Sequence, residues 1–291
     1  MDQAEQLRNI VKLQNQRSEK NARVITITSG KGGVGKSNTA VNLAYQLQEL
    51  GKKVIIFDAD FGLANVEVMF GAIPKYNLSD LIFKGKSITE IITEGPNGIG
   101  FISGGSGIAA LSNLNREQIS YLIRNLAYLD QMADFIIIDT GAGISDSVMD
   151  FVLASPEIIM VSTPEPSSLT DSYSLLKTLY RNPAFQKENG KVKVITNKVN
   201  SSEDAAIVYR KLDTVVSKFL DGNLEFLGMI PADTEIDKAI RQQKPVSILY
   251  PKAASSKAFF KIADNLLNNR EEQIIMRKGV TQMISNFMNR R

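Results

Sequence analysis

The feature that most restricts the fold of this chain is a glycine-rich loop between a β-branched run and a helical pattern. The run at 24–28 leads directly into GKGGVGKS, residues 30–37, which has the spacing G-x-x-x-x-G-K-S. Glycines allow consecutive backbone N–H groups to point inward at phosphate oxygens, and the helix that follows adds the positive end of its dipole. In this strand–loop–helix context the spacing is typical of a nucleotide phosphate cradle.

The residues of this loop have distinct expected contacts with a nucleotide. Lys36 would reach the β- and γ-phosphates, and the Ser37 hydroxyl would bind Mg²⁺. The alternative is a glycine-rich turn that happens to precede a helix, and it does not account for the full spacing. The predicted nucleotide-contacting residues of this segment are Gly30, Lys31, Gly32, Gly33, Val34, Gly35, Lys36, Ser37 and Asn38.

Short apolar runs alternate with helical patterns along the rest of the chain. Strands are predicted at 24–28, 54–57, 100–102, 135–138, 158–161, 192–196 and 224–229. Helices are predicted at 36–50, 115–130, 145–154, 169–181, 203–219 and 253–268. Several of the strands are apolar at every position, as expected when both faces of a sheet are covered. The sequence therefore predicts an α/β fold over residues 21–270, with a doubly wound, mainly parallel sheet flanked by helices.

The composition restricts the chemistry that this chain can perform. The sequence contains no cysteine and no histidine. The first absence excludes disulfides, iron–sulfur ligation and cysteine nucleophiles. The second removes the usual general base and the usual transition-metal ligand. The remaining chemistry uses carboxylates, lysines, backbone amides and a hard cation bound by oxygen.

Three aspartates follow predicted strands. Asp58 and Asp60 lie two apart in an extended segment, so their side chains would face the same way. Asp139 closes the apolar run at 135–138, and its carboxylate would hold Mg²⁺ through a water. Ligands of open α/β sheets bind at the carboxyl ends of the strands, where the glycine-rich loop also lies. The alternative is that each aspartate caps a turn or a helix after its strand.

The second lysine of the loop carries a family resemblance. With Lys31 early in the loop, GKGGVGKS resembles the deviant Walker A motif of the MinD/ParA family of P-loop ATPases. The resemblance implies a dimer formed around ATP, in which Lys31 reaches across the interface to the partner's nucleotide. Spacing alone leaves open that Lys31 is an ordinary exposed loop lysine.

The same resemblance assigns roles to the aspartates. Asp58 matches the aspartate associated with Mg²⁺, Asp60 the residue that positions the attacking water, and Asp139 the Walker B aspartate. The segment 141–143 matches the mobile switch that senses the γ-phosphate. The expected catalytic residues are therefore Lys31, Lys36 and Asp60, and the expected metal ligands are Ser37, Asp58 and Asp139.

A second motif bears on the choice of base. Residues 196–200, TNKVN, look like the NKxD guanine motif, but Asn200 stands in the place of its aspartate. A carboxylate accepts from both guanine donors, whereas an amide cannot, so adenine and hence ATP are favoured. In the family, the residues that match Asn197 and Pro231, Ala232 and Asp233 contact adenine. The segment 163–166 is a weaker candidate near the nucleoside.

The two ends of the chain lie outside the alternating pattern. Residues 2–8, DQAEQLR, resemble the N-terminal motif of the FlhG branch of the family, the regulators of flagellar number and placement. In that branch the motif stimulates the signal-recognition-particle-type GTPase FlhF, and a flagellar C-ring protein is a further expected partner. Helical periodicity alone, with Leu7 and Val11 on one side, would favour a solvated helix over 1–20.

The C-terminal end combines an apolar stripe with basic charge. The stripe is Met276, Val280, Met283, Ile284 and Phe287. Residues 273–291 also contain four basic and no acidic residues, so the chain's net charge of +3 is concentrated there. This pattern suits the surface of an anionic membrane, although the same stripe would serve for packing on the protein body. The near-neutral remainder argues against sequence-specific or general nucleic-acid binding.

These observations predict an ATPase that switches with its nucleotide. The protein is expected in the cytoplasm as a monomer and, as an ATP-bound homodimer, at the inner face of the membrane through residues 271–291. A partition or division-site positioning ATPase of the same family is the main alternative. An iron–sulfur carrier is excluded by the missing cysteines, and no substrate motif supports a metabolic kinase.

Overall fold

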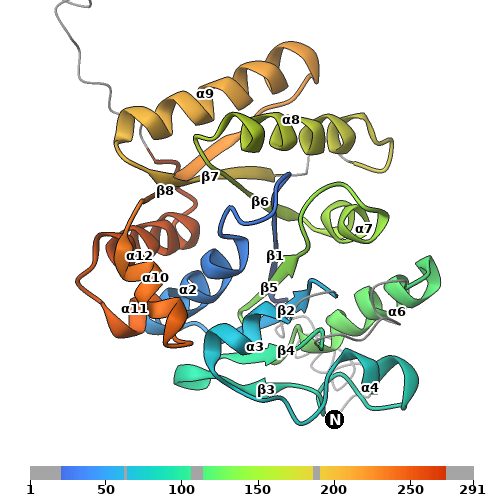
Figure 1. The fold of residues 1–291 in the computed structure, drawn as a ribbon. Coiled ribbons are helices and arrows are strands. Elements are labelled where there is room, and N and C mark those ends of the chain that lie inside the picture. The colour runs from blue at the N-terminus through green and yellow to red at the C-terminus, as the bar shows by residue number, and fades with distance from the viewer. Residues whose placement is uncertain (1–20, 62–63, 106–113, 186–190, 273–291) are drawn as a thin grey trace, which may run out of the picture.

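The computed structural model describes residues 21–272 except 62–63, 106–113 and 186–190 (Figure 1). The N-terminal helix predicted at 1–20 lies outside the described residues. So do residues 273–291, which make up nearly all of the predicted C-terminal amphipathic helix. The described helices include no candidate for a membrane-spanning segment.

The centre of the described chain is one twisted sheet of eight strands in the order β3-β4-β2-β5-β1-β6-β7-β8. The strands are β1 (Arg23–Thr28), β2 (Val54–Ala59), β3 (Thr93–Glu94), β4 (Gly100–Ile102), β5 (Phe135–Thr140), β6 (Glu157–Ser162), β7 (Lys191–Val199) and β8 (Glu225–Pro231). Every neighbouring pair is parallel except β3 with β4. The predicted doubly wound, mainly parallel α/β fold is therefore confirmed.

Helices cover both faces of this sheet. The longer ones are α2 (Lys36–Glu49), α6 (Arg116–Leu126), α7 (Asp146–Ala154), α8 (Pro166–Arg181), α9 (Ser202–Phe219) and α12 (Ala254–Leu267). On one face α2 and α12 pack together over side chains that include Ile25 and Ile27 of β1. On the other face α8 and α9 lie side by side over β6 and β7 (Figure 1). Burial on both faces explains why β2 and β5 are buried at every position.

Several short elements were not predicted. They are α3 (Asn65–Phe70), α4 (Leu78–Phe83), α10 (Thr234–Arg241), α11 (Val246–Leu249), the strand β3 and the 3₁₀ turn at Pro96–Gly98. The helix predicted at 115–130 ends in a further 3₁₀ turn at Ala127–Leu129. Helices of this length are stabilised by packing and capping rather than by periodicity. In α4, for example, Asn77 and Asp80 form a reciprocal capping box.

The strand order brings the glycine-rich loop beside two of the aspartates. β5 lies between β1 and β2, and the parallel register sets Asp139 directly opposite Asp58 and next to Ile27. All three strands end at the same edge of the sheet, where the loop leaves β1. The site described below is built at this edge.

Candidate functional site

The glycine-rich loop is held in place by close contacts that only glycine permits. A Cβ atom on Gly30 would lie 2.1 Å from the carbonyl carbon of Asp171 in α8. Gly35, which precedes α2, has φ +97°, and a Cβ there would lie 2.3 Å from Asn197 Nδ2. Both glycines therefore allow backbone to pack where a side chain would collide.

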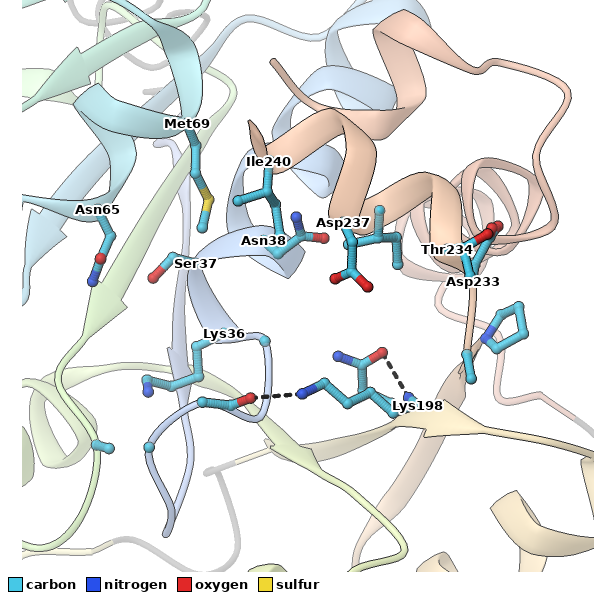
Figure 2. Close-up of a pocket in the computed structure, with 18 of the residues that line it drawn as sticks. Lys36, Ser37, Asn38, Asn65, Met69, Lys198, Asp233, Thr234, Asp237 and Ile240 are labelled. Atoms are coloured by element: carbon cyan, nitrogen blue, oxygen red, sulfur yellow. Dashed lines mark hydrogen bonds between the residues drawn. The ribbon is translucent and has the colours of Figure 1, made fainter. Parts of the chain in front are cut away.

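The loop forms one end of a cavity of about 870 Å³ (Figure 2). The residues predicted to contact nucleotide that line this cavity are Gly32, Gly33, Gly35, Lys36, Ser37, Asn38, Asp60, Asn197, Pro231, Ala232 and Asp233. The other predicted site residues, which lie outside the lining, are Gly30, Lys31, Val34, Asp58 and Asp139. The lining also contains residues that the sequence did not predict, among them Asn65, Lys198 and Asp237. Ala142, from the predicted switch segment, lines it as well.

Asp58 and Asp139 are both fully buried, yet their carboxylates have different surroundings. Asp58 accepts hydrogen bonds from the backbone N–H groups of Asp60, at 3.1 Å, and Val66, at 3.2 Å. Neither carboxylate oxygen of Asp139 has a hydrogen-bond partner of good geometry among the described residues. Asp58 therefore holds the turn after β2, while Asp139 presents an unsatisfied buried acceptor.

Burial governs the protonation of these groups. It raises the pKa of Asp139 to about 7, against the opposing effects of the Ser37 hydroxyl and the Lys36 ammonium. Burial and the neighbouring Asp139 carboxyl also raise the pKa of Asp58 well above its ordinary value. Burial lowers the pKa of Lys36, although Asp139 and Asp60 act in the opposite direction. The arrangement brings together carboxyl groups whose ionised forms a bound cation would stabilise.

Mg²⁺ fits this donor set. Proteins commonly hold this ion through one or two carboxylates, together with waters and phosphate oxygens of the substrate. The unpartnered oxygens of Asp139 and the half-buried Ser37 hydroxyl supply such ligands. Within the described ranges no three acidic residues form a metal cage by themselves.

Asp60 lies where the cavity meets the segment 141–143. It is half-buried, and Asn65 Nδ2 donates a hydrogen bond to its Oδ2 at 3.2 Å. A methyl group added to Gly141 would lie 3.7 Å from Asp60 Oδ1, so the segment passes next to this carboxylate. Gly143 N in turn donates to the carbonyl of Ser29, just before the loop. Asn65 was missed because it opens α3, a helix of six residues with no periodic signal.

Lys31 points away from the cavity, toward the start of α8. Its ammonium lies 2.7 Å from Glu165 Oε2 and 2.7 Å from the Ser167 hydroxyl. The segment 163–166, considered as a nucleoside contact, therefore touches Lys31 and lies outside the cavity lining. In this monomer Lys31 is satisfied by its own chain.

Asn197 and Lys198 connect the end of β7 to the glycine-rich loop. Asn197 Nδ2 donates to the carbonyl of Val34 at 2.8 Å. Lys198 Nζ donates to the carbonyl of Gly33 at 2.9 Å (Figure 2). Lys198 adopts φ +56°, and its backbone N–H donates to Asn197 Oδ1. An amide nitrogen carries two hydrogens, so Asn197 keeps one for a base. The Asn-Lys pair at the end of a strand was the sequence signal that could have identified Lys198.

The carboxylate of Asp233 has a structural task. Its Oδ1 accepts from Glu235 N at 3.0 Å and caps α10. Its Oδ2 accepts from the backbone N–H and the hydroxyl of Ser255, which tie α10 to α12. Any contact of Asp233 with a base is therefore left to its backbone.

Comparisons with known proteins agree with this geometry. Residues 20–267 match the family described as "ParA: NUBPL iron-transfer P-loop NTPase". The chain is 37% identical to the antiactivator FleN of Pseudomonas aeruginosa, over 84% of this chain and 85% of that protein. It is 33% identical to the flagellum site-determining protein YlxH of Helicobacter pylori, over 93% of this chain and 92% of that protein. The structure of the septum site-determining protein MinD from Pyrococcus horikoshii, complexed with Mg-ADP, superposes with a TM-score of 0.71. The alignment is 25% identical and covers 84% of this chain and 96% of that one.

The family's description mentions iron transfer. This sequence contains no cysteine, the residue that holds iron–sulfur clusters in proteins, so its own residues do not support that activity. The family match extends over residues 20–267, and the fold is shared with the MinD structure. The chain belongs to the ParA/MinD family of P-loop ATPases.

Proposed function

We propose that this chain is an ATP- and Mg²⁺-dependent dimerising switch that regulates flagellar number and placement. The observation that carries the nucleotide chemistry is the buried Asp139 carboxylate, unpartnered within the described residues, beside Lys36 and Ser37 of the glycine-rich loop. The flagellar assignment rests on the similarity to FleN and YlxH and on the N-terminal motif at 2–8.

The metal site is proposed at the junction of the loop and β5. The Ser37 hydroxyl and Asp139 would hold Mg²⁺, and Asp58 would support them by fixing the turn after β2. When bound, Mg²⁺ neutralises charge on the β- and γ-phosphate oxygens. Lys36 adds a second positive charge from the loop, and its depressed pKa reflects the dry surroundings in which that charge acts.

Asp60 is the proposed residue that orients the attacking water. Its position at the cavity wall leaves its carboxylate accessible, and Asn65 fixes its orientation through the 3.2 Å hydrogen bond. The neighbouring segment 141–143 would respond to the γ-phosphate, because it lies between Asp60 and the start of the loop. The chain contains no histidine, so a carboxylate is the natural group for this task.

The opposite end of the cavity is the proposed adenine site. Asn197 would donate its second amide hydrogen to the base, and Pro231, Ala232 and the backbone of Asp233 would form the wall. Asn200 cannot provide the carboxylate that guanine recognition requires.

Dimerisation is proposed to depend on Lys31. Two nucleotides that face each other across an interface bring together negative charges, and a lysine from each subunit would neutralise them. For this role Lys31 must leave Glu165 and Ser167, to which it is bound in the monomer.

The ends of the chain are proposed to transmit the switch. Residues 1–20 would stimulate the signal-recognition-particle-type GTPase FlhF, and a flagellar C-ring protein would be a further partner. Residues 271–291 would bind an anionic membrane. Two such segments on one dimer raise avidity by about 10²–10⁴, so the cytoplasmic monomer would move to the inner face of the membrane on binding ATP.

The proposal is tested by flagellar counts in the source organism. Deletion of the gene should change the number or position of flagella, and a wild-type copy should restore them. A copy with Asp60→Ala should fail to restore them although the protein accumulates normally. In vitro, a peptide of residues 1–20 should accelerate GTP hydrolysis by FlhF, and a peptide with Leu7→Ala should do so less.

A partition or division-site positioning ATPase is the second candidate, favoured by the structural match to MinD. It predicts normal flagella with misplaced septa or lost chromosomes in the deletion strain. It also predicts that the 1–20 peptide leaves the GTPase rate unchanged.

A further inference from the structure

One acidic side chain in the cavity has no role in the site as described so far. Asp237, on α10, is exposed and lines the cavity. The other two acids of this helical segment are engaged, since Asp233 caps the helix and Glu235 pairs with Lys238 at 2.8 Å. Asp237 has no hydrogen bond or ion pair with any described residue. Its carboxylate is therefore available to a ligand.

The position of Asp237 indicates which part of a nucleotide it would meet. In Figure 2 its carboxylate points into the cavity, between Lys36 and Ser37 on one side and Asp233 and Thr234 on the other. The first pair lies at the phosphate end and the second at the base end. The sugar of a nucleotide connects its phosphates to its base, so the sugar occupies the space between. We propose that Asp237 accepts a hydrogen bond from the ribose hydroxyls of the bound nucleotide, an inference that rests on the proposed ATP site.

The chemistry of the two groups is complementary. An ionised carboxylate only accepts hydrogen bonds, and the 2′ and 3′ hydroxyls of ribose are neighbouring donors. Hydrogen bonds to a charged acceptor are stronger than those between neutral groups. A carboxylate close to the phosphates would instead repel them. The intermediate position of Asp237 therefore favours contact with the sugar.

Asn38 supplies a second polar group to the same cavity. It is largely buried, and its Oδ1 accepts from Asn42 Nδ2 at 3.3 Å. Its own amide hydrogens are left to donate to a hydroxyl oxygen. A donor on α2 and an acceptor on α10 would together hold a sugar hydroxyl, which can both donate and accept.

The consequence is a preference for ribonucleotides. Loss of the 2′ or 3′ hydroxyl removes one charge-assisted hydrogen bond, which should weaken binding at least about fivefold. Removal of the Asp237 carboxylate should erase the same preference. An amide in its place keeps an acceptor oxygen, so Asp237→Asn should retain part of it.

The test is calorimetric titration of the full-length protein with ATP, 2′-deoxyATP and 3′-deoxyATP, all without a label on the sugar. Wild-type protein should bind ATP at least about fivefold tighter than one of the deoxynucleotides. In Asp237→Ala the dissociation constants of ATP and that deoxynucleotide should differ by less than about twofold. Lys238→Ala, on the same helix but outside the cavity lining, should keep the wild-type preference. Thermal melting establishes that each variant is folded.

Three results would overturn the proposal. The first is equal binding of ATP and both deoxynucleotides to the wild type. The second is a full preference for ATP in Asp237→Ala. The third concerns purine riboside triphosphate, which lacks the 6-amino group of ATP. If Asp237→Ala changes the affinity ratio of ATP to this analogue but not the ratio of ATP to the deoxynucleotides, Asp237 contacts the base and not the sugar. A wild-type protein that binds no ATP would instead refute the nucleotide site itself.

Discussion

Lys31 and Glu165 form an ion pair of 2.7 Å within a single chain, on the surface beside the glycine-rich loop. The lysine proposed to act on a partner's nucleotide is thus already satisfied in the monomer. The hydrogen bond from the Lys31 ammonium and its positive charge hold the pKa of the Glu165 carboxyl below its usual value. The pair has to open before a dimer can form in the proposed way.

Substitution of Glu165 should therefore make dimerisation easier. In an Asp60→Ala background, which should stall hydrolysis if Asp60 orients the attacking water, Glu165→Gln should lower the ATP concentration needed for dimerisation. The shift should be less than about tenfold, because exposed ion pairs contribute little. Light scattering at a series of ATP concentrations measures it.

Two matched variants make this result specific. Glu94→Gln removes an exposed acid on β3, far from Lys31 in the strand order, and should leave dimerisation unchanged. Lys31→Ala should bind ATP as a monomer and fail to dimerise. A Glu165→Gln protein that dimerises less well would show that Glu165 assists Lys31 in the dimer.

The choice of base should follow from Asn200. ATP should bind at least about tenfold tighter than GTP, which corresponds to about 1.4 kcal/mol for one lost charged hydrogen bond. Competition titration of the two nucleotides measures the ratio. Equal affinities would mean that the interpretation of residues 196–200 is wrong. Asn200→Asp should narrow the ratio by restoring a carboxylate.

The buried Asp139 predicts an unusual pH dependence of the free protein. Its pKa is raised to about 7 in the folded state, so between about pH 4 and pH 7 the folded chain holds a proton that the unfolded chain has released. Stability falls with rising pH where the folded state binds more protons. The nucleotide-free protein should therefore lose stability between about pH 4 and pH 7.

Asp139→Asn should weaken this dependence and raise the melting temperature above that of the wild type at pH 8. The part of the pH dependence that remains belongs to Asp58, whose pKa is also raised by burial. Each 1 kcal/mol gained corresponds to about 2–4 °C in a domain of this size. The same variant should lose the stabilisation that Mg-ATP gives the wild type. Differential scanning calorimetry at pH 5, 6, 7 and 8 provides both measurements. An unchanged slope in Asp139→Asn would assign the effect to another group.

Lys198 should hold the glycine-rich loop in place through its side-chain hydrogen bond, although its own backbone adopts an unfavourable positive φ. Lys198→Ala removes the hydrogen bond to the Gly33 carbonyl and should weaken ATP binding, whereas Lys177→Ala on the exposed side of α8 should not. Lys198→Gly should weaken ATP binding equally. It should also melt at a higher temperature than Lys198→Ala, because glycine avoids the penalty of about 1–2 kcal/mol at φ +56°. Titration and thermal melting of the three variants test both statements.

The sequence predicted those parts of the molecule that depend on contiguous residues. The glycine-rich loop, the parallel strands and the larger helices follow from local spacing and from apolar runs such as 135–138. The partners of individual side chains could not be predicted in this way. Asp58 and Asp139 look alike at the ends of their strands, yet one is satisfied by backbone N–H groups and the other is not.

The same limit applies to the cavity wall. Asn65 and Asp237 stand on short helices that periodicity did not indicate, so their place at the site depends on the packing of the whole chain. Asp233 was predicted to contact the base as part of the loop 231–233, and its carboxylate caps α10, so the predicted contact would come from its backbone. Residues 1–20 and 273–291 lie outside the described part of the chain. The predicted stimulation of a GTPase and the predicted membrane binding, which depend on these residues, stay predictions.

The close approach of Gly30 to the backbone of Asp171 limits which substitutions position 30 can accept during evolution. A methyl group at position 30 would force the loop and α8 apart, whereas one at Gly32 would meet nothing closer than the Cβ of Ala142 at 4.0 Å. Position 30 is therefore constrained from outside the cavity, by a helix that need never touch nucleotide. A descendant of this chain that had lost ATP hydrolysis would be free to vary Gly32 and Lys36 long before it could replace Gly30.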